Sequence, residues 1–338
     1  MLNPFPTKSF AVDLGNNNTL VTDSQQILLA QPSYIVFNQR DKSVRAVGDE
    51  AYDIFEKTHD QLKPVRPLRW GVIADYASTT LMLDRMVRQV YKTSGLFSRF
   101  DRIVSGVPYS TTNVERRALR DVMEQFHSRQ VNLVFEPLAA AVGMGLNIRE
   151  PEGRLVIDIG GGITEIVIIS LSGIAVFESL KIAGDNFTEA VIDYVRREHH
   201  VILGWKTAEQ VKMKLGGAMR STEGLAELVV KGKDLADGIP VPVTLRHEEM
   251  VAALDPAVRA IEDKLIQTLD TAPPELAADI FANGIHLTGG SALLRGMSDR
   301  LSRTTGLTVH RDPTPLLSVS KGLSRVLMKP KEYVSVLS

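Results

Sequence analysis

The chain has 338 residues, of which 44% are hydrophobic and 23% are charged, and it contains no cysteine. This composition is that of a folded globular protein of about two domains, and it excludes disulfide bonds, thiol catalysis and thiolate metal sites. With 39 basic and 40 acidic residues, the chain has no overall charge that would attract nucleic acid, so we expect no nucleic-acid partner.

Short apolar runs alternate with amphipathic helices along the chain, which indicates an α/β fold. The segment 1–10 lacks the apolar core of a secretory signal, and no run of about 18 apolar residues follows, so we expect a cytoplasmic protein. Strands are predicted at residues 10–14, 27–30, 34–37, 103–107, 155–159, 165–170, 174–180, 285–288 and 307–310. Proline-rich segments that predict turns lie at 63–67, 239–242 and 273–274.

Apolar residues spaced three or four apart predict the helices and the faces that they bury. One helix should begin with Thr112 and Glu115, which have the spacing of a capping box, and another with Thr207 and Gln210. The predicted stripes are Met82-Met86-Val90, Val114-Ala118-Val122-Phe126 with Leu119 and Met123 beside it, and Phe187-Val191-Val195.

One seven-residue pattern occurs twice. Residues 13–19 and 158–164 both read Asp-x-Gly-x-x-x-Thr, and each lies between two apolar strands. This repetition predicts a duplicated domain. Glycine and asparagine tolerate the positive φ of a tight turn, so backbone N–H groups can point at phosphate oxygens. Asp13 and Asp158 can hold Mg²⁺ through water, and two such hairpins would clamp a nucleotide.

A third glycine-rich segment follows the predicted strand 285–288. Gly289, Gly290 and Ser291 lie between that strand and a helix predicted at 292–301. Such a turn lets the backbone approach a ligand closely and offers helix N-terminal amides. By itself this is a weak signal, but it supports the phosphate-binding interpretation of the two hairpins.

These three elements, in this order and spacing, resemble the actin/Hsp70/sugar-kinase superfamily, and within it the MreB family of bacterial actin homologues. The resemblance extends along nearly the whole chain, through residues 65–68, 71–76, 114–118, 135–141, 183–185 and 271–294. It implies an α/β, actin-like (ribonuclease H-like) fold of two duplicated domains, each with a smaller subdomain, and a nucleotide in the cleft. The implied divisions are subdomain IA at 1–32, 68–140 and 312–338, IB at 33–67, IIA at 141–181 and 244–311, and IIB at 182–243.

The resemblance also implies the site residues and the cofactor, which would be ATP or GTP with Mg²⁺. Glu209 and Lys212 would line the adenosine, and Gly289 and Gly290 would lie beneath the adenine. Glu136 would orient the attacking water, a suitable role for a carboxylate near a γ-phosphate. The implied nucleotide-binding residues are Asp13, Gly15, Asn16, Asn17, Asn18, Asp158, Gly160, Gly161, Gly162, Glu209, Lys212, Gly289, Gly290 and Ser291.

The chain departs from the family pattern at the hairpins. After the three glycines the family has two threonines, whereas this chain has Ile163 and Thr164. Isoleucine has no hydroxyl to hold a water, so Glu136 and Thr164 remain as the catalytic candidates. Asn16 replaces a usual threonine, and Ser291 replaces a frequent glycine. Because backbone amides do most of the binding, we expect an ATP-binding polymer protein with weak or lost ATPase activity.

The loop at 93–100 carries an apolar pair, Leu96 and Phe97, between small residues and Arg99. Such a pair suits shallow insertion at an anionic membrane surface, and it matches the position of the hydrophobic membrane loop in MreB-like proteins. Packing onto the core is the alternative. The resemblance implies a homopolymer of paired protofilaments at the inner face of the cell membrane, which would guide cell-wall synthesis together with membrane proteins of the elongation machinery.

Other functions are possible within the superfamily. A sugar-kinase-type phosphotransferase would need polar insertions for a sugar, and an Hsp70-like chaperone would need a β-rich peptide-binding region after residue 338. We expect neither. A specialised actin-like paralogue that positions an organelle or a plasmid is compatible with the altered hairpins, whereas the Leu96-Phe97 loop favours the wall-associated form.

Overall fold

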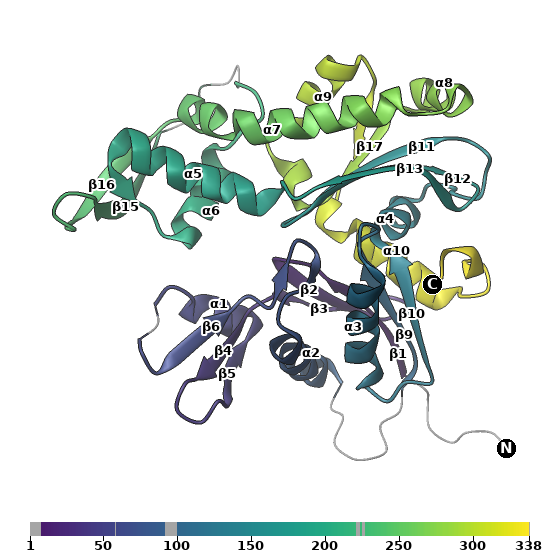
Figure 1. The fold of residues 1–338 in the computed structure, drawn as a ribbon, viewed down its shortest axis with the longest axis horizontal. Helices are drawn as coiled ribbons and strands as arrows, with labels where there is room; N and C mark the ends of the chain where they lie inside the picture. The colour runs from purple at the N-terminus through teal and green to yellow at the C-terminus, as the bar shows by residue number, and fades with distance from the viewer. Residues whose placement is uncertain (1–7, 58, 92–99, 221–223, 225–226, 338) are drawn as a thin grey trace. The chain divides into compact units, whose positions relative to one another are not determined.

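The computed structural model describes residues 8–57, 59–91, 100–220, 224 and 227–337 (Figure 1). The chain forms two compact units, each assembled from separate segments. Unit 1 comprises Met1–Glu152, Ile169–Ile174 and Leu316–Ser338, and unit 2 comprises Gly153–Ile168 and Ala175–Pro315. Each unit contains a five-stranded sheet and a separate three-stranded sheet. The division into four subdomains stays a prediction.

The large sheet of unit 1 has the strand order β10-β9-β1-β2-β3. The neighbours β10, β9 and β1 are parallel, whereas β2 and β3 continue the sheet in antiparallel pairs. Its strands are β1 (Lys8–Leu14), β2 (Asn18–Thr22), β3 (Ile27–Pro32), β9 (Phe100–Val107) and β10 (Gln130–Phe135). The smaller elements are β4 (Ile35–Asn38), β5 (Val44–Val47) and β6 (Leu62–Val65) with α1 (Gly48–Ile54), and the hairpin of β7 (Leu68–Arg69) and β8 (Val72–Ile73).

The core of unit 1 lies between the large sheet and two helices, α2 (Tyr76–Val90) and α3 (Asn113–Glu124). Alternate residues of β1 are buried in this core, because successive side chains of a strand point to opposite faces. The predicted stripe of α2 is confirmed, since Met82 and Met86 are fully buried.

The α3 helix begins as predicted. The Thr112 N–H donates to Glu115 Oε2 at 2.8 Å and the Glu115 N–H donates to Thr112 Oγ1 at 3.3 Å, which are the reciprocal bonds of a capping box. The prediction that Val114 belongs to the buried stripe is wrong, because this side chain is 78% exposed in the first turn. The buried residues of α3 are Leu119, Val122 and Met123.

Two other helices of unit 1 cross with their backbones in close contact: α4 (Glu136–Met144) and α10 (Ser318–Met328). A Cβ atom on Gly143 would lie 1.8 Å from the Ser318 carbonyl oxygen, and a Cβ on Gly322 would lie 1.8 Å from the Ala139 carbonyl oxygen. Only glycine permits this approach. The crossing joins the N-terminal part of unit 1 to its C-terminal segment.

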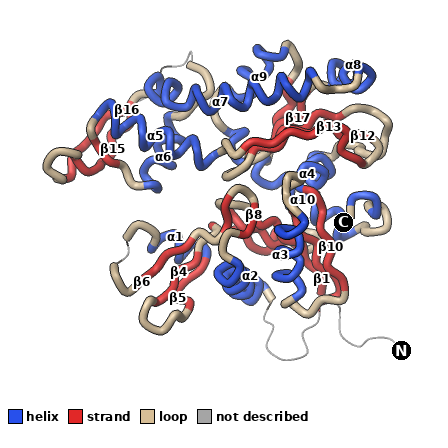
Figure 2. Tube along the Cα trace, viewed as in Figure 1, coloured by secondary structure: helices blue, strands red, loops and turns tan. Residues whose placement is uncertain are grey.

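Unit 2 repeats the strand order of unit 1. Its large sheet runs β13-β12-β11-β17-β18, which corresponds to β3-β2-β1-β9-β10, and β11, β17 and β18 are parallel. This correspondence confirms the predicted duplication. Figure 2 shows the strands of both units in red among the helices in blue. The strands are β11 (Arg154–Ile159), β12 (Thr164–Ser170), β13 (Gly173–Leu180), β17 (Ile285–Thr288) and β18 (Val309–Arg311), with a smaller sheet of β14 (Val201–Ile202), β15 (Leu228–Asp234) and β16 (Pro240–Leu245).

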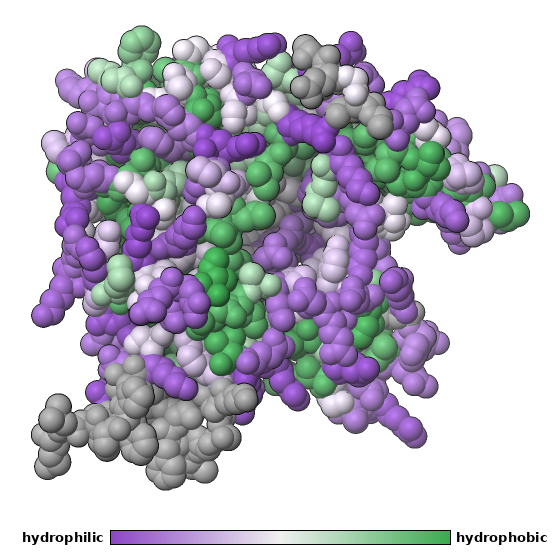
Figure 3. Space-filling view, turned by 180° about the vertical axis from the view of Figure 1, so that it is seen from behind, coloured by the Kyte–Doolittle hydropathy of each residue, from purple (hydrophilic) through white to green (hydrophobic). Residues whose placement is uncertain are grey.

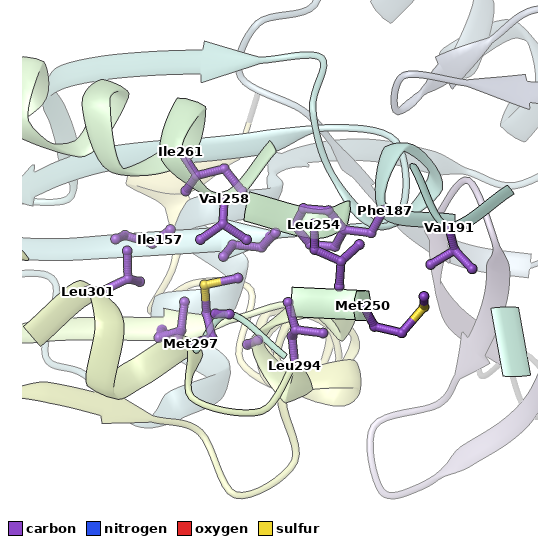
Figure 4. Close-up of a cluster of buried hydrophobic side chains, with 14 of the residues drawn as sticks. Ile157, Phe187, Val191, Met250, Leu254, Val258, Ile261, Leu294, Met297 and Leu301 are labelled. Atoms are coloured by element: carbon purple, nitrogen blue, oxygen red, sulfur yellow. The ribbon is translucent and has the colours of Figure 1, made fainter. Parts of the chain in front are cut away.

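The core of unit 2 gathers around the long α7 helix. Its buried side chains, spaced three or four apart, face Ile157 of β11, Phe187 and Val191 of α5, and Met297 and Leu301 of α9 (Figure 4). The predicted stripe at Phe187, Val191 and Val195 is therefore confirmed. The helices of unit 2 are α5 (Gly184–His199), α6 (Trp205–Leu215), α7 (His247–Asp270), α8 (Pro274–Asn283) and α9 (Met297–Thr305).

Three expectations about element boundaries are wrong. The α6 helix begins at Trp205 after Gly204, without a side-chain cap, and not at Thr207. The helix predicted at 292–301 is instead a short 3₁₀ helix, η1 (Gly290–Leu293), followed by α9. Two of the proline-rich segments form parts of the strands β6 and β16. These are edge strands, where proline is tolerated because one side of the strand needs no ladder bond. Two further 3₁₀ helices are η2 (Pro315–Leu317) and η3 (Val334–Val336).

Exposed hydrophobic side chains are scattered over many elements, among them Val114 of α3 and Phe281 of α8. On the face shown in Figure 3, hydrophobic areas alternate with hydrophilic ones. Within the described ranges, no helix has the length and apolar character needed to cross a bilayer. The predicted membrane-contact residues, Leu96 and Phe97, lie outside the described residues.

The α4–α10 crossing makes a direct prediction. Gly143→Ala and Gly322→Ala should each lower the free energy of unfolding by about 3 kcal/mol or more, because the new methyl group meets a backbone carbonyl that cannot move freely. Urea unfolding of the ligand-free protein measures this. Gly173→Ala is the matched control, since its nearest neighbour would be an ordinary contact at 3.6 Å. Equal stability of all three variants would contradict the prediction.

Candidate nucleotide-binding site

Several of the predicted site residues lie at the carboxyl ends of parallel strands in each unit. In unit 1, Asp13 lies near the end of β1, and Glu136 directly follows β10. In unit 2, Asp158 of β11 is paired in register with Thr288, the last residue of β17, and Gly289 follows. Ligands of open α/β sheets bind beyond such strand ends. Each unit therefore gathers its own group of predicted residues.

The first hairpin (β1–β2) and the second hairpin (β11–β12) close in the same way. The Gly15 N–H donates to the Asn18 carbonyl at 3.1 Å, and the Gly160 N–H donates to the Ile163 carbonyl at 3.0 Å. A Cβ on either glycine would lie 2.9 or 3.1 Å from that same carbonyl oxygen. No residue of either turn has a positive φ. The expectation that positive φ explains these residues is therefore wrong, and close approach of the backbone explains the two glycines.

Side chains hold the first hairpin against neighbouring segments of unit 1. Asn16 Oδ1 accepts from the Gly71 N–H at 2.9 Å, and Asn17 Oδ1 accepts from Arg66 Nη2 at 2.6 Å. Ser33, which directly follows β3, donates from Oγ to the carbonyl of the turn glycine, Gly15, at 2.6 Å. The two asparagine side chains thus fix the shape of the turn. Contacts to a phosphate in this turn are accordingly expected from the backbone.

The second hairpin is held by the start of α5 and by η1. The Gly160 carbonyl accepts from the Gly184 N–H at 3.1 Å and from Ser291 Oγ at 2.9 Å. The Gly161 carbonyl accepts from the Asp185 N–H at 2.7 Å. Two predicted site elements of unit 2, the hairpin and the glycine-rich segment after β17, are therefore in direct contact, and the hairpin also contacts the helix that begins with Gly184.

The threonine of each repeated motif forms a hydrogen bond that connects two segments of its unit. Thr19 is fully buried and shares a hydrogen bond of 2.9 Å with Ser33 Oγ. Thr164 is equally buried, and its hydroxyl donates to the Ile182 carbonyl at 2.7 Å. In both units the partner lies just after the third strand of the sheet, so the threonine joins that segment to the second strand. A catalytic role of Thr164 stays a prediction, and its hydroxyl hydrogen is already engaged.

Glu136 opens α4, and Pro137 follows it at a position that suits the first turn of a helix. A Cβ on Gly106 would lie 3.2 Å from Glu136 Cγ, so the Glu136 side chain lies over the end of β9. In unit 2, Ile163 is half-buried beside the buried Gly162. The role of Glu136 in orienting water stays a prediction.

A compact group of polar side chains lies at the start of α5. Lys212 Nζ lies 2.7 Å from Glu209 Oε2, and it donates to the Gly184 carbonyl at 3.0 Å and to Thr188 Oγ1 at 3.1 Å. The Thr188 hydroxyl also contacts Glu209 Oε2. Sequence reasoning predicted Glu209 and Lys212 here but missed Thr188. The available signal was its spacing of four residues from Gly184, which places both on one face of the helix.

The glycine-rich segment after β17 approaches the end of β11. Gly289 has a φ of 86°, which favours glycine, and a Cβ there would lie 2.4 Å from Asp158 Oδ1. Gly290 begins η1, and Ser291 follows it. The third predicted element therefore lies directly beside the acidic end of the second hairpin.

Comparison with known proteins decides the family. The family model described as MreB/Mbl protein matches residues 7–335. The chain belongs to the MreB/Mbl family. The Escherichia coli K12 cell shape-determining protein MreB is 39% identical over 327 residues, which cover 95% of this chain and 93% of that protein. The Bacillus subtilis 168 cell shape-determining protein Mbl is 34% identical over 321 residues, which cover 95% and 96% of the two chains.

Solved structures support the same conclusion about this MreB/Mbl chain. MreB5 of Spiroplasma citri bound to AMPPNP gives a TM-score of 0.92 at 32% identity, over 98% of this chain and 99% of that one. The ADP-bound MreB5 gives 0.91, at the same identity and over 97% and 98% of the two chains. MamK from a double helical filament, 20% identical with a TM-score of 0.77 over 96% and 99% of the two chains, shows the fold alone. The predicted actin-like fold is thus confirmed, and the family assignment separates the chain from sugar kinases and Hsp70 chaperones.

Asp158 provides an electrostatic feature of the candidate site in unit 2. Burial raises the pKa of Asp158 from 3.8 to about 6, because desolvation disfavours the charged carboxylate. A nearby cation would offset this cost, so the residue fits a cation that accompanies a nucleotide. In the part of the chain that the structure describes, no three His, Cys, Asp or Glu side chains gather as direct metal ligands.

The raised pKa of Asp158 predicts how stability changes with pH. The folded carboxyl binds its proton more tightly than the unfolded one, so the contribution of Asp158 to stability falls as the pH rises from about 4 to about 6. Above that window the carboxylate costs about 2–3 kcal/mol. Asp158→Asn should therefore raise the unfolding free energy of the ligand-free protein near pH 7 and have little effect near pH 3. Thermal melts at the two pH values measure this. Asp193→Asn, with a side chain 63% exposed, is the control that should change neither; an unchanged Asp158→Asn melt near pH 7 would contradict the argument.

Proposed function

We propose that this MreB/Mbl chain is an ATP-binding bacterial actin-like cytoskeletal protein, which polymerises into membrane-associated filaments and organises cell-wall synthesis and cell shape. The main support for this proposal is the match to cell shape-determining proteins along nearly the whole chain. The joined second hairpin, η1 and α5 of unit 2 support the nucleotide site in particular. The AMPPNP and ADP bound to its structural neighbour support the same class of ligand.

Different groups of the proposed site would contact different parts of the nucleotide, according to their charge and hydrogen-bonding capacity. Backbone N–H groups of the two hairpin turns would meet phosphate oxygens, and Asp13 and Asp158 would face the accompanying Mg²⁺ through water. Magnesium would supply positive charge that neutralises the phosphates when bound. Glu209 would serve the nucleoside half of the ligand, because a carboxylate accepts hydrogen bonds but repels phosphate. Gly289 and Gly290 would provide close backbone approach beneath the adenine.

Hydrolysis by this chain is proposed to be weak. Glu136 would orient the attacking water, but Ile163 provides no hydroxyl to share in holding it. The neighbouring Thr164 does not replace that hydroxyl in the described geometry, because its hydrogen is donated to the Ile182 carbonyl. Nucleotide binding depends mainly on the backbone, so it would persist when turnover is slow.

Ile163→Thr tests the hydrolysis proposal. Phosphate release and pelleting are measured together, with ATP, Mg²⁺ and anionic liposomes. The variant should release phosphate at least about tenfold faster than the wild type, because a positioned hydroxyl can now help to hold the water. Both proteins should pellet.

The matched control for that experiment is Ile163→Val, which changes the size of the side chain without adding a hydroxyl. It should stay as slow as the wild type. If the valine variant accelerates as much as the threonine variant, side-chain size and not the hydroxyl controls turnover. If the wild type already turns over ATP as fast as Ile163→Thr, the hydrolysis argument fails.

Self-association and membrane attachment belong to the same proposal. A head-to-tail contact between copies is heterologous and can propagate without closing, and paired protofilaments would multiply weak membrane contacts along one filament. The proposed membrane contact is the apolar pair Leu96 and Phe97, and the proposed location is the inner face of the cell membrane. Membrane proteins of the elongation machinery are the further proposed partners.

Leu96→Ser combined with Phe97→Ser tests the membrane contact. Loss of both apolar side chains should lower co-sedimentation with anionic liposomes by about tenfold. Filament formation without liposomes, followed by light scattering, should stay the same. Unchanged liposome binding by filaments of the double variant would contradict a role for this pair.

A further inference from the structure

In the polar group at the start of α5, the hydrogen-bond donors of Lys212 are all used, whereas one acceptor oxygen of Glu209 is not. An ammonium group has three N–H donors. Those of Lys212 meet Glu209 Oε2 at 2.7 Å, the Gly184 carbonyl at 3.0 Å and Thr188 Oγ1 at 3.1 Å. The Lys212 side chain is only 11% exposed. All three donors are therefore used inside unit 2, and Lys212 has none left to offer a ligand.

Thr188 provides the second link to the same carboxylate. It lies on α5, is fully buried, and has one hydroxyl hydrogen to donate. That hydrogen could go to Glu209 Oε2 or to the Gly184 carbonyl, which lies 3.1 Å away. The Gly184 carbonyl already accepts from Lys212, whereas a carboxylate is the stronger acceptor for an O–H donor. The hydroxyl hydrogen therefore belongs to Glu209.

Both contacts reach the same oxygen of Glu209. Lys212 and Thr188 engage Oε2, so within the described chain Oε1 keeps its lone pairs. The Glu209 side chain is 23% exposed, so it is partly accessible to a ligand. A fixed carboxylate oxygen accepts from hydroxyl or amino groups and repels phosphate. In a nucleotide, the hydroxyl and amino groups that such an oxygen can accept from belong to the nucleoside part.

We propose that Thr188 is a positioning residue for nucleoside recognition, which acts by fixing Glu209 so that Oε1 faces the ligand. Lys212 supports it from the other side and makes no direct contact with the ligand. This inference rests on the proposed nucleotide site. It refines the expectation that Glu209 and Lys212 both line the adenosine, since Glu209 keeps an acceptor oxygen for the ligand whereas the three donors of Lys212 are engaged within the described chain.

The test compares two ligands that share phosphates but differ in the nucleoside. Dissociation constants for Mg²⁺-ATP and Mg²⁺-tripolyphosphate are measured by calorimetry on the full chain, at a concentration below that at which it pellets. Thr188→Val keeps the shape of the side chain and removes the hydroxyl, and Thr188→Ser keeps the hydroxyl. Thermal melts verify that both variants are folded.

Thr188→Val should weaken ATP binding about tenfold, the effect of one lost hydrogen bond, and leave tripolyphosphate binding within about twofold of the wild type. Thr188→Ser should restore ATP binding to within about twofold. Equal weakening of both ligands would show a merely structural role and overturn the proposal, as would unchanged ATP binding. A wild type that binds neither ligand would instead refute the proposed nucleotide site itself.

Discussion

The carbonyl oxygen of Gly160 accepts hydrogen bonds from two separate elements of unit 2. The Gly184 N–H reaches it from the start of α5, and Ser291 Oγ reaches it from η1. These bonds hold the second hairpin between the helix that presents Thr188 and the segment that lies over Asp158. A displacement of this hairpin would separate all three parts of the site at once. The geometry of the proposed nucleotide site in unit 2 thus depends on the backbone acceptors of this turn, the carbonyls of Gly160 and Gly161.

Much of the fold could be predicted because local sequence and tertiary packing agree. The repeated Asp-x-Gly-x-x-x-Thr pattern predicted the duplication, and the two sheets share one strand order. Apolar stripes predicted the buried faces of α2 and α5, since helical spacing decides which side chains meet a sheet. The match to the MreB/Mbl family confirms the resemblance to MreB that we inferred from these motifs. Of the site, the sequence indicated the strand ends and the glycine turns.

The remaining features depend on contacts between distant residues, which no local pattern encodes. Asn16 is typical of a turn, but its side chain accepts a hydrogen bond from the N–H of Gly71, 55 positions away. The glycines of the hairpins are required by a carbonyl across the turn and not by positive φ. Nothing in the local sequence distinguishes Thr188 from other residues of α5, because its contact with Glu209 of α6 forms only in the folded structure. Pro240 and Pro242 suggest a turn, yet an edge strand accommodates both.

The α4–α10 crossing has a consequence for how the protein is made. Unit 1 needs Gly322 against Ala139, so its packing waits for residues near the end of the sequence. Chains emerge from the ribosome N-terminus first, and domains fold as units when their segments are available. Every segment of unit 2 lies before residue 316. Unit 2 begins later in the sequence than unit 1, but it is the first unit whose segments are all synthesised. Until α10 has also been synthesised, unit 1 lacks its C-terminal helix.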